Sequence, residues 1–142
     1  MTRYLLDTNI VSDTRRPQPN AELERWYAAQ SADDLYISTF TIAEIEKGIL
    51  LMPFGRRRDD FERWFAGAMG PRALFRGRLL PFEERAASEW AKLVADGFLA
   101  GKPRSGLDMI VAAVALANDC TLVTANERHF VGVIPFLNPM KG

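Results

Sequence analysis

Apolar and polar residues form two kinds of block along this chain, and each kind predicts a different element. Short apolar runs that end in polar or turn-forming residues are typical of buried strands. They occur at residues 4–6, 35–38, 79–82, 121–124 and 133–136. Between them, apolar residues recur at helical spacing, in segments that begin at Asn20, Thr41 and Glu83, around residues 61–65, and in residues 107–118. Strands that alternate with helices predict an α/β fold, a three-layer sandwich with a central parallel sheet of four to five strands flanked by helices.

Composition narrows the class of protein. With 142 residues, of which 48% are hydrophobic, the chain is expected to form one domain over residues 1–142 with a substantial core. Its 18 basic and 18 acidic residues balance, whereas a protein that coats nucleic acid is usually basic. Any RNA binding is therefore expected to be local, and the zero net charge favours self-association.

The sequence also predicts a cytoplasmic protein. Cys120 is the only cysteine, which excludes an internal disulfide and is typical of a reducing compartment. Asp7 interrupts the first apolar run too early for a signal sequence. The longest uncharged apolar run, residues 109–117, is shorter than the ~20 residues that span a bilayer. No membrane segment is expected.

Polar side chains follow several of the predicted strands. Asp7 ends the first strand, Glu44 lies in the helix after the second, Asp108 begins the buried helix, and Thr124 and Asn126 close the fourth strand. The carboxyl ends of parallel strands meet at one edge of the sheet, so we expect these groups to lie close together.

Each carboxylate also has a structural interpretation. Asp7 can be a turn residue, and Glu44 stands three residues after Thr41, the spacing of a capping box. Asp108 has the same spacing from Ser105, but it leads into an apolar helix where an unpaired charge is costly. Function is therefore the favoured interpretation of Asp108.

Taken together, the three carboxylates indicate a metal site. Clustered carboxylates repel one another, and a divalent cation relieves that repulsion. Oxygen ligands suit Mg²⁺ or Mn²⁺, and the chain has no cysteine–histidine spacing for zinc. Such a site can support metal-assisted phosphodiester hydrolysis.

Four blocks of sequence resemble PIN-domain proteins of the VapC and FitB type. They are Leu-Leu-Asp-Thr-Asn at residues 5–9 with Arg-Arg-Pro at 15–17, the segment 38–48 that holds Glu44, Asp-Met-Ile-Val-Ala-Ala at 108–113, and Thr-Leu-Val-Thr-Ala-Asn at 121–126. A fifth short match, Leu-Asn-Pro at residues 137–139, resembles the tail of the FitB branch.

The resemblance implies a Mg²⁺- or Mn²⁺-dependent endoribonuclease that is the toxin of a type II toxin–antitoxin pair. Asp7, Glu44 and Asp108 would be the catalytic acids and metal ligands, and Asn126, with Thr124, would position the site. It also implies an RNA substrate, a homodimer or larger oligomer, and a cognate antitoxin whose complex with the toxin binds DNA.

One position departs from the family pattern. Where the family often has a fourth acid before a phenylalanine, this chain has His129. Either three acids suffice, which is the preferred interpretation, or Glu127 contributes. His129 is expected to be dispensable for the chemistry yet close to the metal, as a neutral ligand, an outer donor or a simple turn residue.

Two further questions stay open from the sequence. Lys102 and Arg104 precede Asp108 and could hold a phosphate beside the metal, although most basic runs are solvated surface. The main alternative function is a catalytically inactive PIN-fold module that binds or regulates a partner. A phosphoacceptor receiver domain is set aside, because residues 124–126 lack its lysine.

Overall fold

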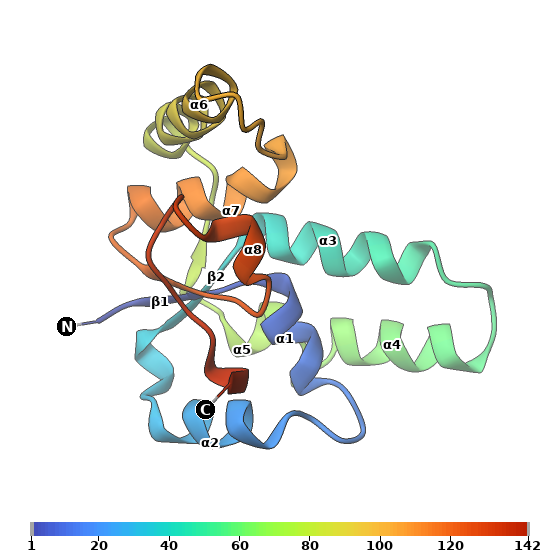
Figure 1. The fold of residues 1–142 in the computed structure, drawn as a ribbon. Coiled ribbons are helices and arrows are strands. Elements are labelled where there is room, and N and C mark those ends of the chain that lie inside the picture. Colours follow the sequence, from blue (N-terminus) through green and yellow to red (C-terminus); the bar gives the residue numbers. More distant parts are fainter. Residues whose placement is uncertain (1, 142) are drawn as a thin grey trace.

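A wholly parallel five-stranded sheet forms the middle layer of the computed structural model, which describes residues 2–141 (Figure 1). Its order is β3-β2-β1-β4-β5, so β1 is central. The strands are β1 (Tyr4–Leu6), β2 (Leu35–Ser38), β3 (Leu79–Leu80), β4 (Thr121–Val123) and β5 (Phe136–Leu137). The register aligns Leu5 with Tyr36 on one side and with Leu122 on the other. The predicted α/β sandwich with a parallel sheet is confirmed.

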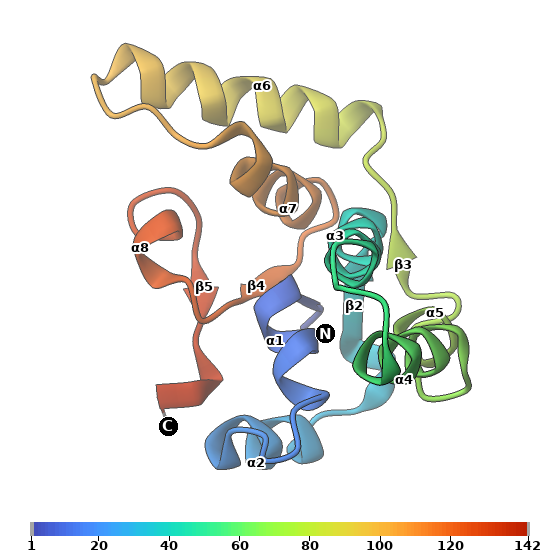
Figure 2. The ribbon, with the colours of Figure 1, turned by 90° about the vertical axis from the view of Figure 1, so that its right-hand side faces the viewer.

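Helices cover both faces of this sheet (Figure 2). Figure 2 shows α6 (Glu84–Leu99) and α7 (Gly106–Ala117) on one side, and α1 (Thr8–Thr14) and α2 (Ala21–Ala29) on the other. The helices α3 (Thr39–Leu50) and α4 (Arg56–Ala66) extend from the sheet as an arm (Figure 1). The remaining elements are short: α5 (Pro71–Leu74), α8 (Glu127–Phe130), and 3₁₀ turns at Ala32–Asp34 and Pro139–Lys141.

The central strands divide the interior into two cores. Successive side chains of a strand point to opposite faces, so Leu5 and Leu122 pack in one core with α7, whereas Leu6 and Val123 pack in the other. Helix α7 supplies an almost continuous run of buried residues to the first core, as its apolar sequence predicted. Both faces of β1 are therefore covered, and the position of the polar residues that follow this strand is well defined.

Several element boundaries differ from the prediction. Strand β3 stops before Pro81, whose backbone has no N–H for the ladder. Residues 131–134 form a turn that includes the positive-φ Gly132, so β5 begins only at Phe136. The segment after Asp7, predicted as a polar turn, is helix α1. Helix α3 begins at Thr39 instead of Thr41, because Ser38 caps it. None of the helices in residues 2–141 is both long and apolar enough to cross a membrane.

Candidate active site

Asp7 occupies the junction between β1 and α1. It is the N-cap of α1, and its Oδ1 accepts a hydrogen bond of 2.8 Å from the backbone N–H of Thr8. Its Oδ2 accepts from Asn9 Nδ2 at 3.0 Å and from the Thr124 hydroxyl at 2.8 Å. The side chain is therefore held in one position, with a residue exposure of only 7%.

The environment of Asp7 favours its neutral form. Burial raises the pKa of this carboxyl above its usual value, and the charge of Asp108 raises it further. Hydrogen bonds from Thr124, Thr8 and Asn9 act in the opposite direction but do not cancel the effect of burial. An ionised Asp7 therefore lies in a site where a nearby cation would be strongly favourable.

Asn9 and Thr124 tie the ends of β1 and β4 together around Asp7. Besides its bond to Asp7, Asn9 donates to Thr124 Oγ1 at 3.3 Å and accepts from the backbone N–H of Ala125 at 2.9 Å. Thr124 is fully buried, and its Oγ1 also accepts from the backbone N–H of Asn126 at 3.0 Å. Sequence reasoning gave Asn9 no role, although it belongs to the Asp-Thr-Asn motif that signalled the site.

Glu44 reaches the site from α3 and is not a capping residue there. The cap is Ser38, whose Oγ accepts from the backbone N–H of Thr41 at 3.1 Å. Glu44 instead accepts a hydrogen bond of 2.5 Å at Oε1 from the Thr8 hydroxyl. The capping-box interpretation of Thr41 and Glu44 is wrong, and Thr8 is a site residue that the sequence analysis missed.

Asp108 stands in the first turn of α7. Its backbone N–H donates to Ser105 Oγ at 3.3 Å, so Ser105 caps the helix as the spacing predicted. Its side chain is 38% exposed, not directed into the apolar interior as expected. The carboxylate therefore remains open to solvent and to ligands.

The three carboxylates and Asn126 border one cavity of about 280 Å³. Thr8 and Asn9 also line it, and its apolar wall consists of Phe40, Leu107, Val111 and Phe130. The topology thus brings together every site residue predicted from the sequence. As the side chains stand, no group of three or more acidic, histidine or cysteine residues among residues 2–141 is arranged to hold a metal ion.

The donor set nevertheless fits a hard divalent cation. The candidate ligands are all oxygens, as Mg²⁺ and Mn²⁺ prefer, and they surround a cavity that is open to solvent. The buried Asp7 carboxylate has a pKa raised by burial and by Asp108, which is the electrostatic cost that a cation removes. Asp7, Glu44 and Asp108 are the residues that would hold such an ion.

The basic loop before Asp108 has a structural role at Arg104. Its Nη1 donates to the carbonyl of Leu93 in α6 at 2.8 Å, so this side chain ties the loop to α6.

Glu127 forms its contacts with residues that do not line the cavity. Asn138 Nδ2 lies 2.7 Å and Lys141 Nζ 2.8 Å from its Oε2. This geometry favours a site with three acids over one that includes Glu127.

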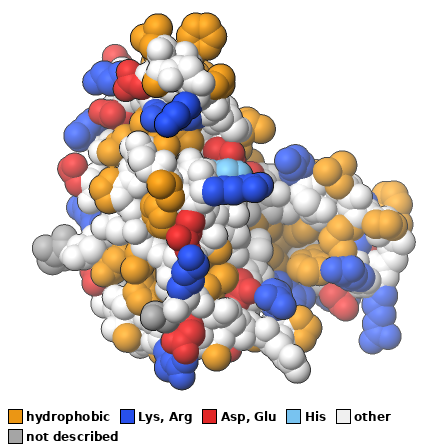
Figure 3. Space-filling view, in the orientation of Figure 1, with side chains coloured by type: hydrophobic (Ala, Val, Ile, Leu, Met, Phe, Trp, Pro, Cys, Tyr) orange, Lys and Arg blue, Asp and Glu red, His pale blue; other side chains and the backbone are white. Residues whose placement is uncertain are grey.

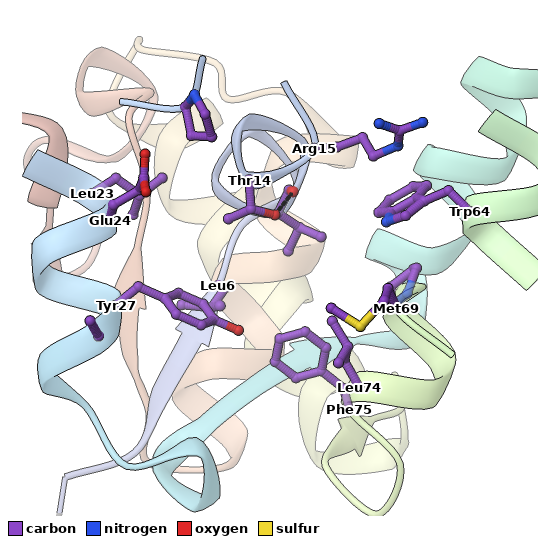
Figure 4. Close-up of a pocket in the computed structure, with 14 residues that line it drawn as sticks. Leu6, Thr14, Arg15, Leu23, Glu24, Tyr27, Trp64, Met69, Leu74 and Phe75 are labelled. Atoms are coloured by element: carbon purple, nitrogen blue, oxygen red, sulfur yellow. Dashed lines mark hydrogen bonds between the residues drawn. The ribbon is translucent and has the colours of Figure 1, made fainter. Parts of the chain in front are cut away.

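A second, larger cavity has a volume of about 470 Å³ (Figure 4). Its lining is mostly apolar and comes from β1, α1, α2, α4 and the segment around α5. Figure 4 shows Leu6, Tyr27, Leu74 and Phe75 around it, with Arg15 and Glu24 among its few charged residues. The acidic residues of the first cavity do not line it, so this cavity is suited to binding apolar groups.

Comparisons with known proteins agree with this fold. The PIN domain family profile matches residues 4–133. The chain is 38% identical over 126 residues to the plasmid stability protein StbB of Pseudomonas syringae pv. tomato, covering 89% of each chain. It is 32% identical to toxin FitB of Neisseria gonorrhoeae, covering 95% of this chain and 96% of that protein. The same identity and coverage relate it to the VapC ribonuclease Y4jK of Sinorhizobium fredii.

A solved structure extends the likeness to three dimensions. The chain superposes on a chain of FitAB bound to an IR36 DNA fragment with a TM-score of 0.87 and 30% sequence identity, covering 96% of this chain and 95% of that one. The profile match and the full-length relatives show the family. The chain belongs to the PIN domain family and is of the VapC and FitB type.

Proposed function

We propose that this protein is a Mg²⁺- or Mn²⁺-dependent endoribonuclease that acts in the cytoplasm as the toxin of a type II toxin–antitoxin pair. The observation that carries the proposal is the single cavity bordered by Asp7, Glu44 and Asp108. The family membership supports it, because a relative of 32% identity is a VapC ribonuclease. RNA is the proposed substrate.

The residues of the site would have the following roles in the proposed reaction. A divalent cation held by Asp7, Glu44 and Asp108 would polarise the phosphodiester and lower the pKa of a water molecule. Thr124, Asn9 and the Thr8 N–H hold Asp7, and the Thr8 hydroxyl holds Glu44 at Oε1. Asn126 lines the same cavity and offers an amide to the RNA or the cation.

The test is an RNase assay on purified protein with Mg²⁺, with Mn²⁺ and with a chelator. We expect cleavage with either metal and none with the chelator. The Asp108→Asn variant should lose at least about 100-fold in activity, since even outer partners of metal ligands cost 10–100-fold. A protein that neither binds these metals nor cleaves RNA would instead be an inactive PIN-fold module.

We further propose that the apolar cavity in Figure 4 receives a segment of the cognate antitoxin. The FitAB structure supports a partner of this kind. Within the cavity, Arg15 stacks over Phe61 and Trp64, at 4.9 and 5.5 Å from the ring centroids. Its Nε is buried without a hydrogen bond. The expected segment is therefore apolar and brings a carboxylate or carbonyl oxygen to Arg15.

A binding assay with the product of the neighbouring reading frame tests this partner. Leu74→Asp places a charge in the cavity and should weaken binding at least tenfold. Val131, which is exposed and does not line this cavity, offers the control variant Val131→Asp, expected to bind as the wild type does. Equal binding by both variants would place the antitoxin elsewhere. DNA binding is then measured on the complex.

A homodimer is the proposed oligomeric state. Phe98 and Leu99 at the end of α6 are 73% and 80% exposed, and Leu107 at the rim of the carboxylate cavity is 62% exposed. Apolar side chains are visible on this end of the molecule in Figure 3. Exposed apolar surface of this kind marks interfaces. Light scattering coupled to size-exclusion chromatography should give twice the 16.0 kDa chain mass.

A further inference from the structure

His129 approaches Asp108 from the short helix α8. Its Nδ1 lies 3.2 Å from Asp108 Oδ2. The approach links α7 and α8, since Asp108 lies in the first turn of α7 and His129 stands in α8. The two side chains are 38% and 37% exposed, so the pair lies at the surface of the site.

The two nitrogens of this imidazole are in different environments. Nδ1 is buried and has no aligned hydrogen bond, although the ring as a whole is partly exposed. A buried N–H without an acceptor is costly, and the Asp108 carboxylate is an acceptor within reach. A hydrogen bond from Nδ1–H to Oδ2 would remove this cost.

We propose that His129 is a positioning residue for Asp108. Through Nδ1–H it occupies Oδ2 and so turns the other carboxylate oxygen toward the metal cavity. The proposal rests on the proposed function, because it takes Asp108 as a metal ligand. In this proposal His129 does not itself bind the metal. An acidic residue at position 129 would bind the metal directly, whereas His129 contributes to the site by orienting Asp108.

The physical reason is orientation. Metal-binding carboxylates are themselves hydrogen-bonded, and loss of such an outer partner typically weakens metal binding 10–100-fold. The exposure of this pair places the expected effect at the lower end of that range. Once the metal is saturating, the cleavage rate should change little. The variant phenotype is therefore a higher metal requirement with nearly unchanged kcat.

The first test measures Mn²⁺ binding alone, without RNA, on full-length variants of confirmed fold. His129→Leu should weaken binding about tenfold, and His129→Asn, which keeps a donor near the Nδ1 position, should restore it to within about threefold. The matched control is Arg128→Gln in the same short helix. Removing this exposed cation should not weaken binding of another cation.

The outcomes separate this proposal from the proposed function. Wild-type affinity in His129→Leu, together with weak binding in Asp108→Asn, overturns the positioning role and leaves the metal site intact. Wild-type affinity in Asp108→Asn overturns the metal site and the positioning role with it. Equal loss in His129→Leu and His129→Asn overturns the role of the Nδ1 donor.

A second readout observes the contact directly. His129 is the chain's single histidine, so ¹⁵N spectra of the imidazole contain one pair of nitrogen resonances. For the neutral imidazole, the proposal requires a proton on Nδ1 and none on Nε2. Asp108→Ala should abolish this preference. A wild-type ring protonated on Nε2 contradicts the proposal, whatever the metal affinities are.

Discussion

Asp7 is the residue at which stability and chemistry conflict most directly. Its carboxylate is buried at the end of the central strand, and burial raises its pKa above the unfolded-state value. Above this raised pKa the folded protein must carry an ionised group that it disfavours. The free energy of unfolding therefore contains a contribution that is present at low pH and lost as the pH rises through the pKa of Asp7.

The Asp7→Asn variant separates these two effects. We expect it to be inactive, because it removes a charged metal ligand, and to remain folded, because it also removes a buried charge. The amide oxygen can still accept the Thr8 N–H that caps α1, although the amide nitrogen cannot accept from Asn9 and Thr124 as Oδ2 does. Relative to the wild type, the variant should gain stability as the pH rises from acid to neutral. Urea unfolding of both proteins at a series of pH values measures this. If the difference in the free energy of unfolding between the two proteins did not change with pH, burial would not raise the pKa of Asp7.

Glu44 provides the second prediction at this scale. In Glu44→Gln the amide oxygen can still accept the Thr8 hydroxyl, which donates to Oε1 in the wild type, but the ligand charge is gone. Activity should fall at least about tenfold, and the free energy of unfolding should change by less than ~1 kcal/mol. Paired RNase assays and urea curves check both values. Thr8→Val, which removes the donor, should lower activity less than Glu44→Gln does.

The sequence analysis singled out three carboxylates that the structure places around one cavity. Asp7 and Glu44 follow strands whose apolar runs are clear, Asp108 opens the clearly apolar segment of α7, and the topology brings the three to one cavity. Their partners were harder to predict. That Thr8 binds Glu44 depends on contacts between residues 36 positions apart. Ser38 and Thr41 are both plausible helix caps, and only the structure distinguishes them.

At the scale of elements, the short helices were the ones that sequence analysis missed. Helices α1 and α8 have seven and four residues, too few to be stable in isolation because helix nucleation is costly. Tertiary contacts stabilise them instead: Ile10 and Val11 anchor α1 in the second core, and Phe130 anchors α8 in the first. Long helices such as α6 and α7 carry enough periodic sequence to be predicted.

Two glycines in long helices make the effect of element packing measurable. A Cβ at Gly97 in α6 would lie 2.8 Å from Arg104 Cγ and 2.9 Å from the Lys102 carbonyl oxygen, whereas a Cβ at Gly48 in α3 would meet nothing within 4 Å. We expect Gly48→Ala to stabilise the fold by about 0.5–1 kcal/mol. Gly97→Ala should destabilise it by about 1–2 kcal/mol, because overpacking exceeds the helix gain.

Urea denaturation of the two glycine variants measures both effects. The loop that Gly97 contacts leads to Asp108, so Gly97→Ala should also reduce RNA cleavage, whereas Gly48→Ala should not. If both variants were stabilised equally, the close approach of Arg104 to α6 would have to be absent in solution. The same result would remove the structural role that its bond to the Leu93 carbonyl indicates.

At the scale of the whole molecule, the numbers of basic and acidic residues are equal, but their distribution is uneven. Basic and acidic side chains are mixed on the face of the molecule that Figure 3 shows, in keeping with a net charge of zero. The exception is the carboxylate cavity, where Asp7, Glu44 and Asp108 lie together. A surface of this kind offers RNA little general attraction, so binding should depend on the site itself and on its cation.

The last prediction follows from this concentration of negative charge. A cation that binds the folded chain but not the unfolded chain stabilises the fold, by about 2.7 kcal/mol when it is present at about 100 times its Kd. For a chain of this size each kcal/mol raises Tm by roughly 3 °C, so saturating Mn²⁺ should raise Tm by about 8 °C. This rise in Tm should disappear in Asp108→Asn. Ca²⁺ or Mg²⁺ should raise Tm only if it binds to the folded chain. Calorimetric scans of the wild type and the variant, with and without metal, provide the measurement. An equal rise in both proteins would show that the cation stabilises the fold at some other place, and the carboxylate cavity would then not be its site.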